Sequence, residues 1–106
     1  MAGSQILLAA VTVSELRYWA LVAGWGEARR RRLEEAIGTV GVIPVTDNLV
    51  TEAAELRFAC RQAAHPLSDR THAHDLWIAA SAIHASAALL TADGIFVDTP
   101  GLRLVA

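Results

Sequence analysis

The sequence alternates between short apolar runs and longer stretches in which apolar residues recur at helical spacing. The apolar runs have the length of β-strands. They span Ile6 to Val11, Val40 to Val45, Ala88 to Thr91 and Leu102 to Val105. Pro44 marks the end of the second run, because proline lacks the backbone N–H that a central strand position needs. The pattern therefore predicts about four short strands.

Helical periodicity fills the intervals between these runs. The first predicted helix follows Thr12 or Ser14, either of which can cap it, and ends at Gly24-Trp25-Gly26. The other three helices are predicted at Glu27 to Ile37, from Thr46 or Asp47 to about Ala64, and at Asp75 to Ser86. Strands that alternate with helices predict a parallel sheet covered by helices, which is an α/β fold.

The apolar positions of the helices also predict which faces are buried. One face of the first helix is formed by Val13, Leu16, Trp19 and Ala20. One stripe of the third helix is formed by Leu49, Ala53, Leu56 and Cys60. The last helix is apolar on nearly all sides and rich in alanine and serine, so we expect it to be buried and closely packed. The segment of residues 65–71 has the composition of a polar loop.

Length and composition narrow the class of protein. A chain of 106 residues suffices for one small domain, so we expect residues 1–106 to form a single domain. It contains neither an apolar run of about 18 residues nor the basic start of a signal peptide, so we expect a cytoplasmic protein with no membrane partner. The single cysteine, Cys60, is expected to be a core thiol. The formal net charge of −2 means that any contact with nucleic acid must be local.

Three acidic residues stand in apolar surroundings where a solvated charge is not expected. Glu15 lies early in the first helix, Asp75 begins the last one, and Asp93 follows a predicted strand. Carboxylates that converge on folding repel one another unless a cation joins them, and Mg²⁺ prefers such oxygen ligands. The alternative is that Asp75 caps a helix, Asp93 belongs to a turn, and Glu15 is an exposed helix charge. Spacing alone leaves both interpretations open.

The order of the motifs adds a family resemblance. The motifs are Val11-Thr-Val-Ser-Glu15-Leu-Arg-Tyr18, His72-Ala-His-Asp75-Leu-Trp-Ile-Ala-Ala80, Leu90-Thr-Ala-Asp93-Gly-Ile-Phe96 and Pro100-Gly-Leu-Arg-Leu104. Together they resemble a PIN domain of the VapC type over essentially the whole chain. The resemblance implies a three-layer sandwich, a parallel sheet flanked by helices, and a cytoplasmic endoribonuclease toxin dependent on Mg²⁺ or Mn²⁺. It also implies three partners, namely RNA, a VapB-type antitoxin and a second copy in a homodimer.

By position, Glu15, Asp75 and Asp93 match the family's second, third and fourth acids, which makes them the implied catalytic residues and metal ligands. The family's opening strand, ending in Asp-Thr-Asn or a close variant, and the helix after it have no counterpart here. We therefore expect a PIN-like fold that lacks the first strand and helix, with Met1 an internal or wrongly chosen start or the gene truncated. Ile95 also stands where many relatives carry another acid.

Because only three of the family's four carboxylates have a counterpart, we expect little or no nuclease activity from this chain. The missing strand predicts that the chain self-associates or exchanges elements with another copy. The alternative function is a non-catalytic remnant that binds an antitoxin or another partner. Antitoxin binding without RNA cleavage would distinguish the two.

Several other residues could have a functional role, but a structural or solvated role explains most of them better. The four histidines, at positions 65, 72, 74 and 84, lack zinc-site spacing, and His72 is better placed to shape the loop near Asp75. The run Arg29 to Arg32 could contact RNA phosphates or an acidic antitoxin segment, but neighbouring glutamates favour a solvated, salt-bridged face. Trp77 is expected in the core, and Trp25 at an exposed surface.

Overall fold

The computed structural model describes residues 6–105, which form two compact units. The N-terminal unit ends at Pro44, and the C-terminal unit begins at Val45. The first contains β1 (Leu7–Ala9), α1 (Ala10–Val22), α2 (Glu27–Gly38) and β2 (Gly41–Ile43). The second contains α3 (Asp47–Gln62), α4 (Ala73–His84) and three short 3₁₀ turns, η1 (Pro66–Ser68), η2 (Arg70–His72) and η3 (Gly94–Phe96). The mixed α/β fold predicted from the sequence is confirmed.

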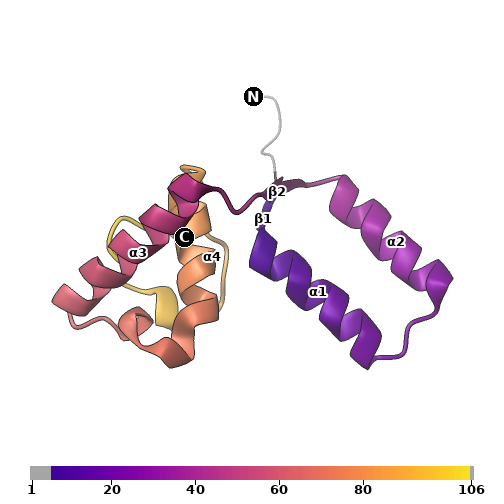
Figure 1. The fold of residues 1–106 in the computed structure, drawn as a ribbon, viewed down its shortest axis with the longest axis horizontal. Helices are drawn as coiled ribbons and strands as arrows, with labels where there is room; N and C mark the ends of the chain where they lie inside the picture. The colour runs from indigo at the N-terminus through magenta and orange to yellow at the C-terminus, as the bar shows by residue number, and fades with distance from the viewer. Residues whose placement is uncertain (1–5, 106) are drawn as a thin grey trace. The chain divides into compact units, whose positions relative to one another are not determined.

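The N-terminal unit is a small parallel sheet with two helices packed on it. β1 and β2 pair in parallel, with Leu8 opposite Val42. α1 and α2 run side by side as a hairpin between the strands, and both contact the sheet (Figure 1). Parallel strands need a long crossover connection, which this hairpin supplies. The predicted arrangement of helices flanking a parallel sheet is therefore confirmed.

The first strand and the cap of the first helix differ from the prediction. β1 stops at Ala9, and α1 already begins at Ala10. Ala9 occupies the N-cap position without a side-chain hydrogen bond, so the predicted caps at Thr12 and Ser14 were wrong because both residues lie inside the helix. An apolar run of this length fits a strand or a buried first helical turn equally well.

The predicted apolar face of α1 is only partly buried. Val13 and Ala20, two turns apart, are buried, whereas Leu16 and Trp19 are exposed. Within this unit, the small sheet and α2 contact only a narrow strip of the α1 surface. Val13 and Ala20 lie on that strip and are therefore buried.

The C-terminal unit is centred on α3 packed against α4. The predicted stripe of α3 is confirmed, since Leu49, Ala53, Leu56 and Cys60 are all buried. α4 begins two residues earlier than predicted and buries mostly small side chains, at Leu76, Ala79, Ala80, Ser81 and Ala82. Small side chains allow two helices to approach closely, which agrees with the expected close packing.

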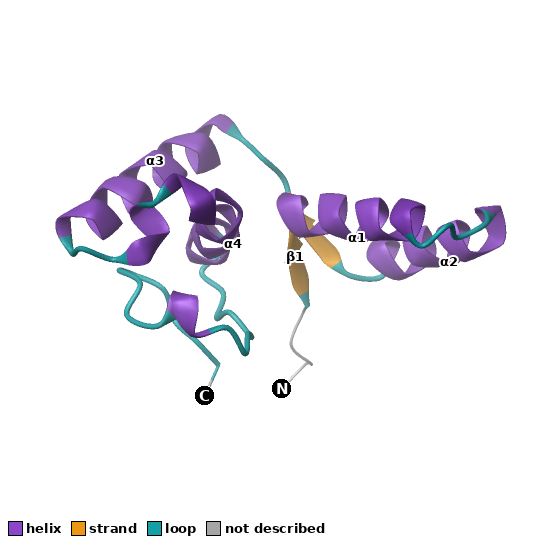
Figure 2. Ribbon diagram, turned by 90° about the horizontal axis from the view of Figure 1, so that it is seen from below, coloured by secondary structure: helices purple, strands orange, loops and turns teal. Residues whose placement is uncertain are grey.

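The chain that follows α4 is mostly loop (Figure 2). The two strands predicted at residues 88–91 and 102–105 are reduced to one parallel bridge between Leu89 and Leu104. Two hydrogen bonds hold it, from Leu89 N–H to the Arg103 carbonyl at 2.8 Å and from Val105 N–H to the Leu89 carbonyl at 2.9 Å. The prediction of two full strands was wrong, because an apolar run shows that a segment is extended but not how many neighbours it pairs with.

The segment predicted as a polar loop, residues 65–71, is folded into η1 and η2. Leu67 is fully buried and His65 is 7% exposed, so this segment forms part of the core of the unit. Asp69 caps η2 by accepting hydrogen bonds from the N–H and hydroxyl of Thr71, both at 2.8 Å. These bonds, the backbone one first, lower the pKa of Asp69. Among the described residues, none of the helices has both the length and the apolar character to cross a membrane.

The C-terminal end of α3 fixes the position of the backbone of the buried His65. Ala64 has a φ of 54°, and His65 N–H donates back to the Cys60 carbonyl at 2.7 Å. Ala64 N–H donates to the Arg61 carbonyl at 3.2 Å, which completes a Schellman motif. Glycine usually occupies this left-handed position, because any Cβ there is strained.

Ala64→Gly is therefore expected to stabilise the protein by about 1 kcal/mol, since it relieves the left-handed strain. Chemical denaturation followed by circular dichroism measures this change. Ala63→Gly is the matched control, because the φ of Ala63 is −85°, a negative value that does not call for glycine. The control should lower stability, and equal effects of the two variants would contradict the assignment.

Candidate functional site

Asp75 lies in the first turn of α4, where the positive end of the helix dipole favours an anion. Its side chain is 31% exposed, and Oδ2 lies 3.7 Å from Nδ1 of His72, the residue that precedes the helix. His72 makes no side-chain capping bond, so its contact with Asp75 agrees with the predicted role in shaping this loop. The carboxylate of Asp75 is half-buried and keeps oxygen atoms that can bind a cation.

Asp93 is the N-cap of η3. Its Oδ1 accepts a hydrogen bond from Ile95 N–H at 3.0 Å, and its own N–H donates to Thr91 Oγ1 at 3.1 Å. Asp93 therefore has the structural role in a turn that the alternative interpretation expected. The capping bond uses one carboxylate oxygen, and within residues 6–105 Oδ2 has no hydrogen-bond partner, so it is available as a ligand.

The elements that carry Asp75 and Asp93 share one neighbour in the C-terminal unit. α4 and η3 both contact η1, and η2 joins η1 directly to the start of α4. His65 makes the link to η3, because its Nε2 lies 2.8 Å from the carbonyl oxygen of Val97, the C-cap residue that follows η3. The fold of this unit thus ties the two acidic segments to a common turn.

Glu15 belongs to the N-terminal unit. It lies on α1, is half-buried, and accepts a hydrogen bond from Trp19 Nε1 at 3.1 Å, one helical turn away. Taken separately and within residues 6–105, neither unit gathers three histidine, cysteine, aspartate or glutamate side chains that could hold a metal. The carboxylate oxygens of Asp75 and Asp93 nevertheless have the hard-donor chemistry that Mg²⁺ and Mn²⁺ prefer.

The other residues singled out from the sequence have structural partners. The Nδ1 atom of His84 lies 2.6 Å from Oε2 of Glu52, and this contact joins α4 to α3. Cys60 is buried, and desolvation raises the pKa of its thiol, which confirms the predicted core thiol. Trp77, which was expected in the core, is only half-buried in α4. His65 is the residue whose importance the sequence did not reveal, because a histidine beside a proline in a polar segment carries no burial signal.

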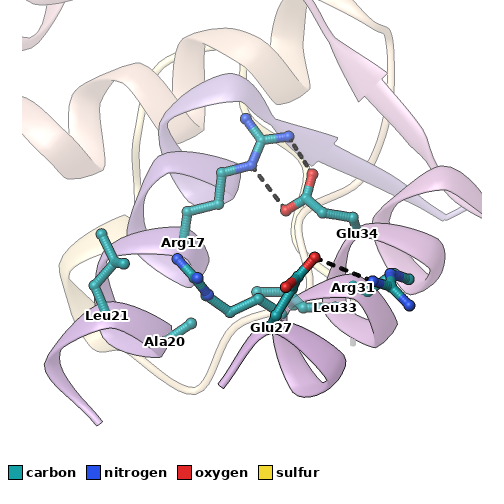
Figure 3. A pocket seen from close by; sticks show the side chains of 8 residues that line it. Arg17, Ala20, Leu21, Glu27, Arg31, Leu33 and Glu34 are labelled. Atoms are coloured by element: carbon teal, nitrogen blue, oxygen red, sulfur yellow. Dashed lines mark hydrogen bonds and ion pairs between the residues drawn. The ribbon is translucent and has the colours of Figure 1, made fainter. Parts of the chain in front are cut away.

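A hollow of about 430 Å³ lies between α1 and α2, and two ion pairs lie among the side chains that line it (Figure 3). Arg17 pairs with Glu34 at 2.7 Å, and Arg31 pairs with Glu27 at 3.2 Å. The hydrogen bond from Arg17 lowers the pKa of the exposed Glu34 carboxyl. The hollow does not include Glu15 in its lining. The Arg31–Glu27 pair confirms the expected salt-bridged face for part of the arginine run.

Trp25 is exposed, as predicted, and Arg29 lies over its ring at 5.2 Å from the centroid. This cation–π contact occupies one more arginine of the run. A surface contact of this kind contributes about 0.5–1 kcal/mol.

Comparisons with known proteins agree with the resemblance. The PIN domain family model matches residues 1–102, which spans both units and all three predicted acids. The fold is similar to a chain in the crystal structure of VapBC2 from Rickettsia felis bound to a DNA fragment from its promoter, with a TM-score of 0.77 and 24% sequence identity. That match covers 95% of this chain and 74% of the other. No curated protein sequence gives a significant match.

Proposed function

Since the chain belongs to the PIN domain family, we propose that it is a metal-dependent endoribonuclease toxin of a VapBC-type toxin–antitoxin pair. The observation that carries the proposal is the family match across Glu15, Asp75 and Asp93. The structure supports it by tying the segments of Asp75 and Asp93 to η1. Mg²⁺, with Mn²⁺ as the alternative, would be held by Asp75, Asp93 and Glu15.

The proposed mechanism assigns separate tasks to these residues. A bound divalent cation would supply activation of water and neutralisation of charge on an RNA phosphodiester. Asp75 would offer a carboxylate from the first turn of α4, at the positive end of the helix. Asp93 would bind through Oδ2 while Oδ1 holds its own turn. Glu15 would contribute a third carboxylate from α1, which Trp19 orients by its indole N–H.

Two further parts of the proposal concern partners and rate. We propose a VapB-type antitoxin as the partner that blocks the site, and a homodimer as the assembly; the support is the fold similarity to a chain from a VapBC2 complex. Cleavage is expected to be slow, because only three of the family's four acids have a counterpart in this sequence. For the same reason, the second candidate is the binding-only function, in which the chain binds an antitoxin or another partner without cleaving RNA.

The test uses the purified 106-residue protein, bacterial total RNA and Mn²⁺. We expect Mn²⁺ to bind with one site per chain in electron paramagnetic resonance titrations, and RNA to be cut slowly with Mg²⁺ and not with EDTA. Cleavage that persists in EDTA would contradict a metal-dependent site. Absence of both binding and cleavage would favour the binding-only function.

A further inference from the structure

We propose that His65 is a positioning residue that holds the Asp93 turn against η1, at the end of the unit where α4 begins. The proposal rests on the proposed function, in which Asp93 is a metal ligand. It is carried by the hydrogen bonds of one buried imidazole, which join segments more than 30 positions apart in the sequence.

The hydrogen bonds of His65 define the tautomer of its ring. Leu67 N–H donates to Nδ1 at 3.1 Å, so Nδ1 carries no proton, and the neutral ring has its proton on Nε2. Nε2–H then donates to the Val97 carbonyl at 2.8 Å. Thr99 Oγ1 lies 3.3 Å from the same nitrogen, and its own proton goes to the Phe96 carbonyl at 2.8 Å, so its oxygen accepts from the ring. A single tautomer of the ring, with the proton on Nε2, thus satisfies both ring nitrogens.

The same bonds connect the two ends of the η3 turn to different supports. Asp93 caps the first end by accepting from Ile95 N–H. The imidazole of His65 binds the other end through the Val97 carbonyl. The backbone of His65 is in turn anchored to α3, because its N–H donates to the Cys60 carbonyl at 2.7 Å. His65 is 7% exposed, so water does not readily replace these bonds. The orientation of the Asp93 carboxylate therefore depends on a residue that does not touch it.

Two substitutions separate the two halves of this link. His65→Asn keeps an acceptor near the Nδ1 position for Leu67 N–H but is too short to reach Val97. His65→Gln places an amide N–H near the Nε2 position and can keep the bond to the Val97 carbonyl. His84→Gln is the matched control, because His84 joins α4 to Glu52 and, among the described residues, forms no hydrogen bond with η3.

The experiment measures amide hydrogen exchange of Ile95, Val97 and Thr99 by NMR, together with Mn²⁺ affinity, in the full chain. His65→Asn is expected to speed exchange at these amides about tenfold, the effect of losing one buried hydrogen bond. Its Mn²⁺ affinity is expected to fall about 10- to 100-fold, as for other residues that orient ligands. His65→Gln should recover most of both effects, and His84→Gln should change neither.

Unchanged exchange at the three amides in His65→Asn would overturn the proposal. Faster exchange with unchanged Mn²⁺ affinity would also overturn the positioning role, while leaving the proposed nuclease function intact. If the unmodified protein binds no Mn²⁺, the proposed function fails. The exchange rates of the three amides in His65→Asn then still test whether His65 holds the turn.

Discussion

Replacing Asp75 by asparagine is expected to lower Mn²⁺ affinity and Mg²⁺-dependent RNA cleavage by about 100-fold or more, since loss of a residue that only orients a ligand already costs about 10- to 100-fold. Asparagine has nearly the same shape, so the packing of α4 should survive. The removed charge is the quantity that matters, because the cation must offset the repulsion between carboxylates. Electron paramagnetic resonance titration and single-turnover cleavage measure the two effects.

Asp98→Asn is the matched control for this substitution. Asp98 is exposed, lies in the same unit close in sequence to η3, and has a φ of 62°, a conformation that asparagine adopts readily. It therefore removes one negative charge near the proposed site without strain. Equal losses in Asp75→Asn and Asp98→Asn would show that the cation responds to overall charge, and the assignment of Asp75 as a ligand would fail.

Leu67→Ala is expected to destabilise the protein by about 2–5 kcal/mol, because it removes a fully buried leucine and leaves a cavity. The side chain comes from η1, which contacts α3, α4, η2 and η3, so a cavity there affects every element of the C-terminal unit. In a protein of this size the loss corresponds to a fall in Tm of about 10 °C or more. Thermal and urea unfolding followed by circular dichroism provide the measurement.

Two controls separate cavity formation from a general loss of leucine contacts. Leu67→Met keeps the volume and should cost less than about 1.5 kcal/mol. Val50→Ala removes a side chain from the exposed side of α3, where the valine is 47% exposed, and should change stability by no more than about 0.5 kcal/mol. A Leu67→Ala protein as stable as Val50→Ala would show that η1 does not belong to the folded core.

Periodicity predicted α3 well because its buried positions recur without interruption from Leu49 to Cys60. It failed at the start of α1, where an apolar run fits both a strand and a helical turn. It failed again near Leu89 and Leu104, because strand pairing depends on neighbours that are distant in the sequence. Local pattern thus determined the long elements, and tertiary context determined the short ones.

The candidate site shows the same division. The motifs identified Asp75 and Asp93, and the family match spans both. They did not identify His65, because its role depends on Val97 and Thr99, which the sequence places far away. Nor could they show that Asp93 caps η3 with one oxygen and leaves the other open. Residue type and spacing reveal which groups could act, whereas the hydrogen bonds that orient them follow only from the fold.

The small side chains of α4 have a consequence for mutagenesis. Four of its twelve residues, Ala73, Ala79, Ala80 and Ala82, are already alanine, and three of these are buried. An alanine scan therefore leaves these positions of α4 unchanged and cannot test their packing. Enlarging substitutions at Ala79 or Ala80 probe it instead, because tightly packed positions fail when volume is added.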